Sequence, residues 1–244
     1  MGAIFKKEIK TLFLTPIGWV VIALYNCLAG IMFVFTVLNN QTSDVKSFFG
    51  SLILIILMSV SVLSMKFFSE ERKTKTDQLL LTSPVSLSGI VLGKFFAAMI
   101  VYMSALLVSI IYIIIIAILG TPEMGVVFGN YLGLTLVGGA LIAVGLFISS
   151  LTQSQVISAV LTFSIFIVML LSGALVDMIK NLIVGMNETL KTIITSIADT
   201  FAIYDKFTQF TSGMLDISAI VYYLSMIAIF LFLTVRVLEK RRWS

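Results

Sequence analysis

The residues that could do chemistry in this 244-residue chain are few, and most of them lie in one short segment. Within residues 66–94, the run FSEERKTKTDQLLLTSPVS places charges of both signs before a leucine triplet and a proline. The sequence has no histidine and one cysteine, Cys27, which excludes an internal disulfide, a His–Cys metal cluster and a His-based catalytic triad. The chemistry that remains is ion pairing and contact with another protein.

The stretch GIVLGKF at residues 89–95 is superficially similar to a phosphate-binding loop. That loop needs four residues between its glycines, and a Ser or Thr after the lysine to hold Mg²⁺. Here three residues separate Gly89 from Gly93, and Phe95 follows Lys94. We therefore predict that this chain binds no nucleotide or other cofactor, and that Lys94 anchors the start of a membrane span at the lipid headgroups.

The elements that must position the connector are apolar. The chain is 59% hydrophobic and 11% charged, with a mean hydropathy of +1.13, whereas soluble domains have about a quarter charged residues. Six segments without Asp, Glu, Lys or Arg are near or above the length that crosses a hydrocarbon core of about 30 Å as a helix. The sequence therefore predicts an all-α integral membrane protein, one domain over residues 1–244, with six transmembrane helices at 17–38, 48–65, 95–119, 124–148, 156–176 and 217–235.

The basic residues predict the orientation of these spans. All but four of the 16 Lys and Arg residues lie on the side that holds both termini and the 66–94 connector; the exceptions are Lys46, Lys180, Lys191 and Lys206. Cytoplasmic loops carry the excess of Lys and Arg. We therefore expect a multi-pass plasma-membrane protein with cytoplasmic termini and a cytoplasmic connector.

Two amphipathic segments flank the spans. In residues 1–16, an N-terminal helix would place lysines at the lipid headgroups and gather an apolar face from Phe5, Ile9, Leu12 and Phe13. In residues 177–216, apolar residues from Leu182 to Ile197 recur at helical spacing. This predicts an outer amphipathic helix, which is either a structural cap over the spans or a lid on a path through them.

The connector itself has two interpretations. It is either a solvated loop that fixes topology, or a short helix in which Glu71 and Lys75 pair one turn apart. In the second case Leu79, Leu80 and Leu81 expose apolar surface where no lipid covers it. Such a surface on a short cytoplasmic helix typically marks a protein contact.

The connector resembles the signature of the ABC-2 (type-2) family of ABC exporter permeases. EERKTKTDQLLLTSPVSLSGIVLGKF is similar to the family's E-R-x-x-G-T-x-E-x-L-L-x-[ST]-P-[VLI] run, which ends in Gly-Lys before span three. Lys75 stands where that pattern usually has Gly, and Asp77 where it has Glu. The residues that match are Glu71, Arg72, Thr76, Leu79, Leu80, Ser83, Pro84, Gly93 and Lys94.

Three other segments are similar to the gliding-motility-associated branch of this family, so the resemblance covers the whole chain. They are KKEIKTLFLTPIGWVVIALY at 6–25, GLFISSLTQSQVISAVLTF at 145–163 and FLTVRVLEKRRW at 232–243. The first contains the branch's E-x-x-x-x-[FL]-x-[ST]-P-[IL]-[GA]-[YW] pattern.

The resemblance implies a division of labour between two chains. The connector would be a coupling helix that seats in a groove of a separate ATPase subunit, which binds ATP and Mg²⁺. It also implies a homodimer of permeases in a bacterial membrane, with two ATPases. The implied ATPase-coupling residues are Glu70, Glu71, Arg72, Thr76, Leu79, Leu80, Ser83 and Pro84, with Phe5 and Glu8 of the N-terminal helix.

The absence of charged residues from the predicted spans indicates which class of transporter and which kind of substrate fit this chain. Ion-coupled carriers and charged-ring channels keep ionisable residues in the membrane, which weighs against both classes here. A hydrophobic or amphipathic substrate, such as a peptide, a lipid-like molecule or a drug, fits better. Tyr25, Asn26, Tyr102 and Asn130 are polar side chains in or near the spans that either meet cargo or form hydrogen bonds between helices.

The sequence therefore predicts the transmembrane permease subunit of an ATP-driven exporter, which is not itself an enzyme. The alternatives are a stand-alone transporter or channel that ATP does not power, and a membrane anchor that recruits a cytoplasmic protein. A membrane hydrolase is disfavoured because the sequence has no HExxH motif, no G-x-S-x-G elbow and no histidine.

Overall fold

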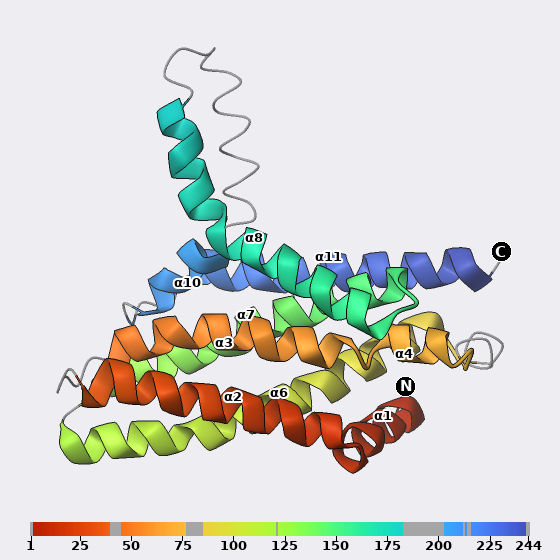
Figure 1. Ribbon diagram of the computed structural model, residues 1–244. Helices are drawn as coiled ribbons and strands as arrows, with labels where there is room; N and C mark the ends of the chain where they lie inside the picture. The colour runs from red at the N-terminus through yellow and green to blue at the C-terminus, as the bar shows by residue number, and fades with distance from the viewer. Residues whose placement is uncertain are drawn as a thin grey trace.

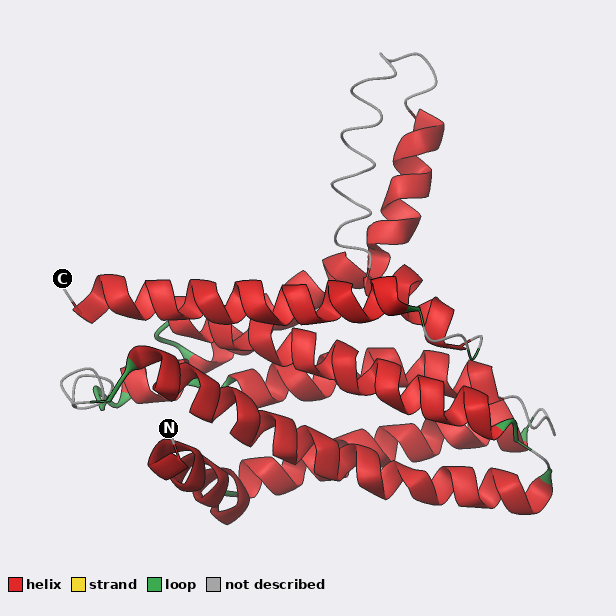
Figure 2. Cartoon of the chain, turned by 180° about the vertical axis from the view of Figure 1, so that it is seen from behind, coloured by secondary structure: helices red, strands yellow, loops and turns green. Residues whose placement is uncertain are grey.

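The computed structural model describes residues 2–39, 45–76, 85–120, 122–182, 203–211, 213 and 216–242. For Ala3, Asp205 and residues 174–177 and 179–182, only the backbone is described. All regular elements in these ranges are helical (Figures 1 and 2). They are α1 (Gly2–Leu14), α2 (Pro16–Phe33), the π-helical turn η1 (Val34–Leu38), α3 (Val45–Ser64), α4 (Phe68–Lys73), α6 (Leu87–Leu119), α7 (Met124–Leu151), α8 (Gln155–Leu182), α10 (Ile203–Thr211) and α11 (Ile217–Arg242).

The prediction of six spans is confirmed. The helices that are long and apolar enough to cross a membrane are Pro16–Leu38, Val45–Lys73, Leu87–Leu119, Met124–Leu151, Gln155–Gly173 and Ile217–Arg242. The third is longer than predicted, since α6 begins at Leu87 rather than at Phe95. Ser86 caps its first turn by accepting a hydrogen bond from the backbone N–H of Gly89 at 3.3 Å.

Both termini lie at the same end of the helix bundle, together with α4 and the start of α6 (Figures 1 and 2). We call this the connector end. The short helix α4 follows α3 after a turn at Met65–Phe67. The predicted common side of the termini and connector therefore matches the arrangement of the bundle, while its assignment to the cytoplasm stays a prediction.

The central helix of the bundle is α7, which packs against α3, α6, α8, α10 and α11. Most of its residues are buried, and small residues let its neighbours approach closely. At Gly138 the ring of Tyr102 lies directly over the backbone of α7, where an added Cβ would overlap it. The Tyr102 hydroxyl then donates a 2.7 Å hydrogen bond to the carbonyl of Leu134.

The far end of the bundle is closed in part by α10. Phe207 and Phe210 are fully buried against the long helices, and the Tyr223 hydroxyl donates a 2.8 Å hydrogen bond to the carbonyl of Ile203. The predicted outer helix at 182–197 lies almost entirely outside the described residues. What the structure adds is that α8 continues to Leu182, and that its last part turns away from the other helices (Figure 1).

We predict that Gly138→Ala destabilises the protein, because the new methyl group must displace a buried tyrosine ring. Overpacking of this kind costs about 1–3 kcal/mol. The matched control is Gly125→Ala in the same helix, where an added Cβ meets nothing within 4 Å. Unfolding of the protein in detergent micelles, followed by circular dichroism, should show a lower midpoint for Gly138→Ala only. Equal midpoints for the two variants would contradict this packing.

Candidate functional site at the connector

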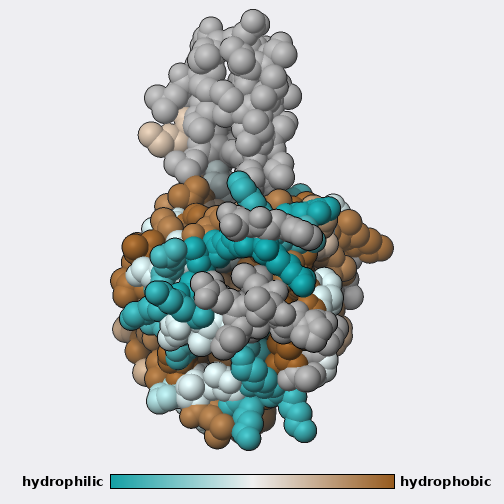
Figure 3. Space-filling model, turned by 90° about the vertical axis from the view of Figure 1, so that its right-hand side faces the viewer, coloured by the Kyte–Doolittle hydropathy of each residue, from teal (hydrophilic) through white to brown (hydrophobic). Residues whose placement is uncertain are grey.

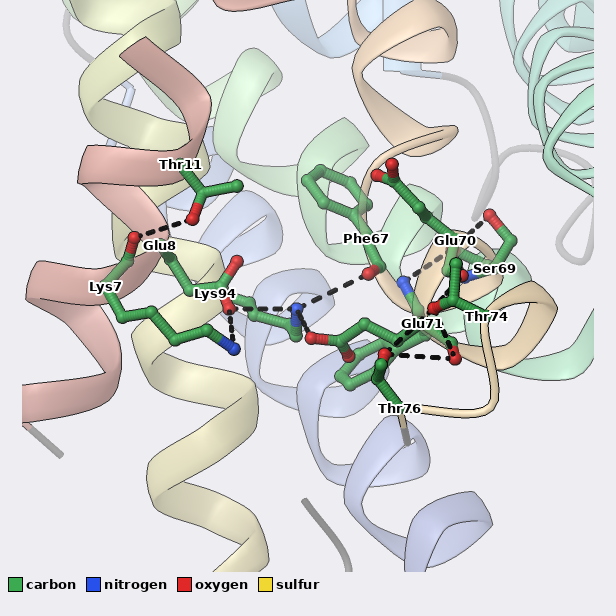
Figure 4. Close-up of polar contacts among 12 residues, drawn as sticks. Lys7, Glu8, Thr11, Phe67, Ser69, Glu70, Glu71, Thr74, Thr76 and Lys94 are labelled. Atoms are coloured by element: carbon green, nitrogen blue, oxygen red, sulfur yellow. Dashed lines mark hydrogen bonds and ion pairs between the residues drawn. The ribbon is translucent and has the colours of Figure 1, made fainter. Parts of the chain in front are cut away.

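The site is built around Lys94, whose residue is 3% exposed although it carries a charge. Its ammonium nitrogen lies 2.9 Å from a carboxylate oxygen of Glu71 and 3.2 Å from one of Glu8 (Figure 4). The same nitrogen donates a 3.4 Å hydrogen bond to the carbonyl of Phe67 and lies 5.2 Å from the ring centre of Phe68. We call Lys94, Glu8 and Glu71 the Lys94 cluster.

The cluster joins three helices that are far apart in sequence. Glu8 comes from α1, Glu71 from α4 and Lys94 from the first turns of α6 (Figure 4). The Lys94 side chain is therefore not free to reach the lipid headgroups as expected, because it binds Glu8 and Glu71 instead. Because α6 begins earlier than predicted, Lys94 lies inside the helix and faces α1 and α4 rather than the membrane surface.

Gly93 explains how α1 comes close enough for Glu8 to reach Lys94. A Cβ added at Gly93 would lie 3.1 Å from Ile4 Cγ2 and 3.4 Å from the backbone nitrogen of Phe5. With no side chain there, α1 lies directly on α6. The adjacent Gly-Lys pair of the motif thus has a physical reason. The missing side chain of Gly93 lets α1 approach α6, and Lys94 binds the carboxylate of Glu8 on α1.

The start of α4 is capped from another helix. The Ser149 hydroxyl oxygen, on α7, accepts hydrogen bonds from the backbone N–H groups of Phe68 at 2.9 Å and Ser69 at 3.0 Å. It also donates to the Ser69 hydroxyl at 3.2 Å. The local N-cap residue is Phe67, which has no side-chain acceptor, so Ser149 satisfies backbone donors that would otherwise be orphaned.

The end of α4 is a Schellman motif. The N–H of Thr76 bonds the carbonyl of Glu71 at 2.9 Å, and the N–H of Lys75 bonds that of Arg72 at 3.2 Å. Lys75 has a φ of 58°, in the left-handed region. This is the position where the resembled pattern has Gly, the residue for which that conformation carries no steric penalty. The predicted helical pair of Glu71 with Lys75 is wrong because α4 ends at Lys73.

The electrostatics of the cluster favour a fixed geometry. Two carboxylates share one ammonium, and the side chains are 2% exposed for Lys94, 10% for Glu8 and 15% for Glu71. Removing charges from water is costly, so such a group persists only where each charge is paired and hydrogen-bonded. The cluster therefore locks the relative positions of α1, α4 and α6 more than it adds net stability.

Most of the predicted coupling residues that are described lie close to this cluster. Phe5 is half-buried beside Gly93, and Glu70 pairs with Lys66 at 2.5 Å. Arg72 is half-buried in α4, and Thr76 closes its C-terminal turn. The predicted contact residues Leu79, Leu80, Ser83 and Pro84 lie outside the described residues.

The predicted substrate-path residues lie between packed helices. Tyr25, Tyr102 and Asn130 are buried, and the Asn130 side-chain amide donates to the carbonyl of Val126 at 2.8 Å. Asn26 is half-buried and bonds the carbonyl of Ala105 on α6 at 3.3 Å. The bonds of Asn26 to Ala105 and of Tyr102 to Leu134 join different helices, whereas the Asn130 bond lies within α7. A role of these residues in meeting cargo stays a prediction.

Polar side chains gather on the connector end, with apolar side chains around its rim (Figure 3). The C-terminal helix α11 contributes to this end, because the Arg241 guanidinium donates a hydrogen bond to the carbonyl of Ser150 near the end of α7. A cation at a helix C-terminus also interacts favourably with the helix dipole. The connector end is thus a polar surface held by contacts among α1, α4, α6, α7 and α11.

We predict that Lys94→Met destabilises the protein, since it leaves two buried carboxylates facing each other. Removing one partner of a buried pair costs about 3–5 kcal/mol. The exposed pair Arg236–Glu239, at 2.8 Å, is the control. Arg236→Gln should change the unfolding free energy in micelles by less than about 1 kcal/mol. Adding Glu8→Gln and Glu71→Gln to Lys94→Met should recover part of the loss; no recovery would contradict the charge argument.

We also predict that Lys75→Gly stabilises the connector, because a non-glycine residue in the left-handed region costs roughly 1–2 kcal/mol. Lys73→Gly is the matched control, since Lys73 is the last residue of α4 and exposed. Glycine within a helix costs about 0.5–1 kcal/mol. Limited proteolysis at the connector should therefore be slower than wild type for Lys75→Gly and faster for Lys73→Gly. The opposite order would rule out the Schellman turn.

Comparison with known protein families identifies the family to which this chain belongs. The family model described as "ABC-2 family transporter protein" matches residues 7–237, a range that includes Glu8, Glu71 and Lys94. No curated protein matches the sequence. The gliding-motility-associated branch stays a prediction, since the family model does not distinguish it. With six apolar helices and a match over almost its whole length, the chain belongs to the ABC-2 family of transporter membrane proteins.

Proposed function

We propose that this chain is the permease subunit of an ATP-driven exporter, and that its connector receives force from a separate ATPase. The observation that carries the proposal is the Lys94 cluster. A contact on α4 is transmitted to α6 through Glu71 and Lys94, and to α1 through Glu8. Because α6 continues from Lys94 as a membrane span, a push at the connector reaches the bundle without an intervening flexible loop.

The ATPase supplies the chemistry that the permease lacks. ATP and Mg²⁺ bind to that partner, and the permease contributes the docking surface at Glu70, Arg72, Thr76 and the leucines that follow. In this proposal Glu8 and Glu71 act mainly by positioning, since both carboxylates bind Lys94. Phe5 and the exposed part of α1 would add a second contact.

Two copies of the permease would form the path for a hydrophobic or amphipathic molecule. The proposed orientation places the connector end and both termini in the cytoplasm of a bacterial cell, because the Lys and Arg residues concentrate there. The stand-alone transporter and the membrane anchor remain the competing functions. Neither needs an ATPase whose activity depends on the connector, so that dependence separates them from the exporter.

Co-purification tests the proposal. Tagged wild-type chain, isolated from membranes of its own cells, should bring down an ATPase subunit, and the complex should hydrolyse ATP. Leu79→Asp with Leu80→Asp should abolish the association, because charges replace the apolar contact surface. Leu79→Ile with Leu80→Ile is the control that keeps this surface and should retain the complex. An ATPase that remains bound and fully active with the Asp variant would overturn the assignment of the contact.

A further inference from the structure

An apolar groove lies beside the Lys94 cluster, between α1 and α6. Its volume is about 440 Å³, within the range of roughly 300–1,000 Å³ of small-molecule sites. The residues that line it are Gly2, Phe5, Phe96, Met99, Ile100 and Met103. Methionine side chains are flexible and fit irregular apolar ligands, so the lining is suited to a chain that is itself flexible.

The surface around the groove has the composition of a face that contacts lipid rather than another membrane helix. Membrane helices that pack together present small residues to each other. The exposed face of α6 that continues from the groove carries large side chains instead, at helical spacing. They are Phe96, Ile100, Leu107, Ile111, Ile114 and Ile118.

The groove extends from the connector end along the charge-free part of α6. Lys94 lies at the connector end, and Met99 and Met103 follow it along α6. At 1.5 Å per residue they are roughly 8–14 Å farther along the helix axis. A ligand in the groove therefore has its apolar part beside the charge-free run of α6, which begins at Phe95, and its polar part near α1.

Lysines of α1 lie where that polar part would be. Lys6 follows Phe5 directly and lies one turn after Gly2, and both of these neighbours line the groove. Lys10 lies one further turn along the same helix, and both residues are exposed. Two ammonium groups beside an apolar groove are complementary to a ligand with an anionic head and an apolar tail.

We propose that this groove binds an anionic phospholipid, with an acyl chain along Phe5, Met99 and Met103 and the phosphate headgroup at Lys6 and Lys10. The lipid then bridges α1 and α6 next to Gly93, where these helices touch. A ligand that binds only the folded protein stabilises it. The lipid content of the membrane thereby sets how firmly α1 is held against α6.

Binding can be measured on the purified full-length chain in micelles by native mass spectrometry. Phosphatidylglycerol and phosphatidylcholine with identical acyl chains are added in turn, so that only the headgroup charge differs. Each lysine near an anionic lipid is worth about a fivefold gain in affinity. We expect at least a fivefold preference for phosphatidylglycerol. Equal retention of the two lipids would overturn the proposal.

Variants locate the site. Lys6→Gln with Lys10→Gln should remove the headgroup preference, whereas the control Lys240→Gln with Arg242→Gln, which also removes two exposed positive charges, should keep it. Ile100→Trp and Met103→Trp should each fill the groove and lose one bound lipid, while Ile111→Trp on the same helix face outside the groove should not. Unchanged lipid retention in both filling variants, or loss of a dimer in place of lipid, would contradict the assignment.

Discussion

A lysine buried between two carboxylates is the constraint on which the connector end depends. Burial of the Lys94 ammonium is costly unless carboxylates pair with it, and Glu8 and Glu71 both reach it. That requirement fixes α1 and α4 on the first turns of α6, and Gly93 makes the approach of α1 possible. Ser149 adds a fourth helix by capping α4 from α7. The described first part of the connector, α4, is thereby held against α6 and α7.

The fold could be predicted from the sequence because the lipid environment determines which segments must be helices. Long runs without charge must be helices in lipid, and the six spans are visible in composition alone. Their ends were harder to place: α6 starts at Leu87 and continues through Lys94, whose charge marked the start of the predicted span at Phe95. The buried aromatic pair of α10, Phe207 and Phe210, also went unrecognised, because its burial depends on packing against distant helices.

The site was predicted only in part. The charged run and its motif identified Glu71 and Arg72, but the left-handed turn at Lys75 was not predicted, although the pattern usually has Gly at that position. The partner of Glu71 could not be read from local spacing, because Lys94 is 23 residues away and Glu8 is farther. Ser149 gave no sequence signal at all: a serine at the end of a span is ordinary until its tertiary neighbour is known. The Gly93-Lys94 pair, which this sequence shares with the family pattern, was the one indication in the sequence that Lys94 has a specific partner.

Amide hydrogen exchange in lipid nanodiscs tests most directly whether the Lys94 cluster holds α1 and α4 as one unit on α6. Wild type and Lys94→Met are compared peptide by peptide. If the cluster holds both helices on α6, amide exchange in Lys94→Met rises in both α1 and residues 68–76, while α10 at the far end keeps its protection. If exchange rises in only one of the two helices, or in neither, they are held independently, and the cluster does not couple them.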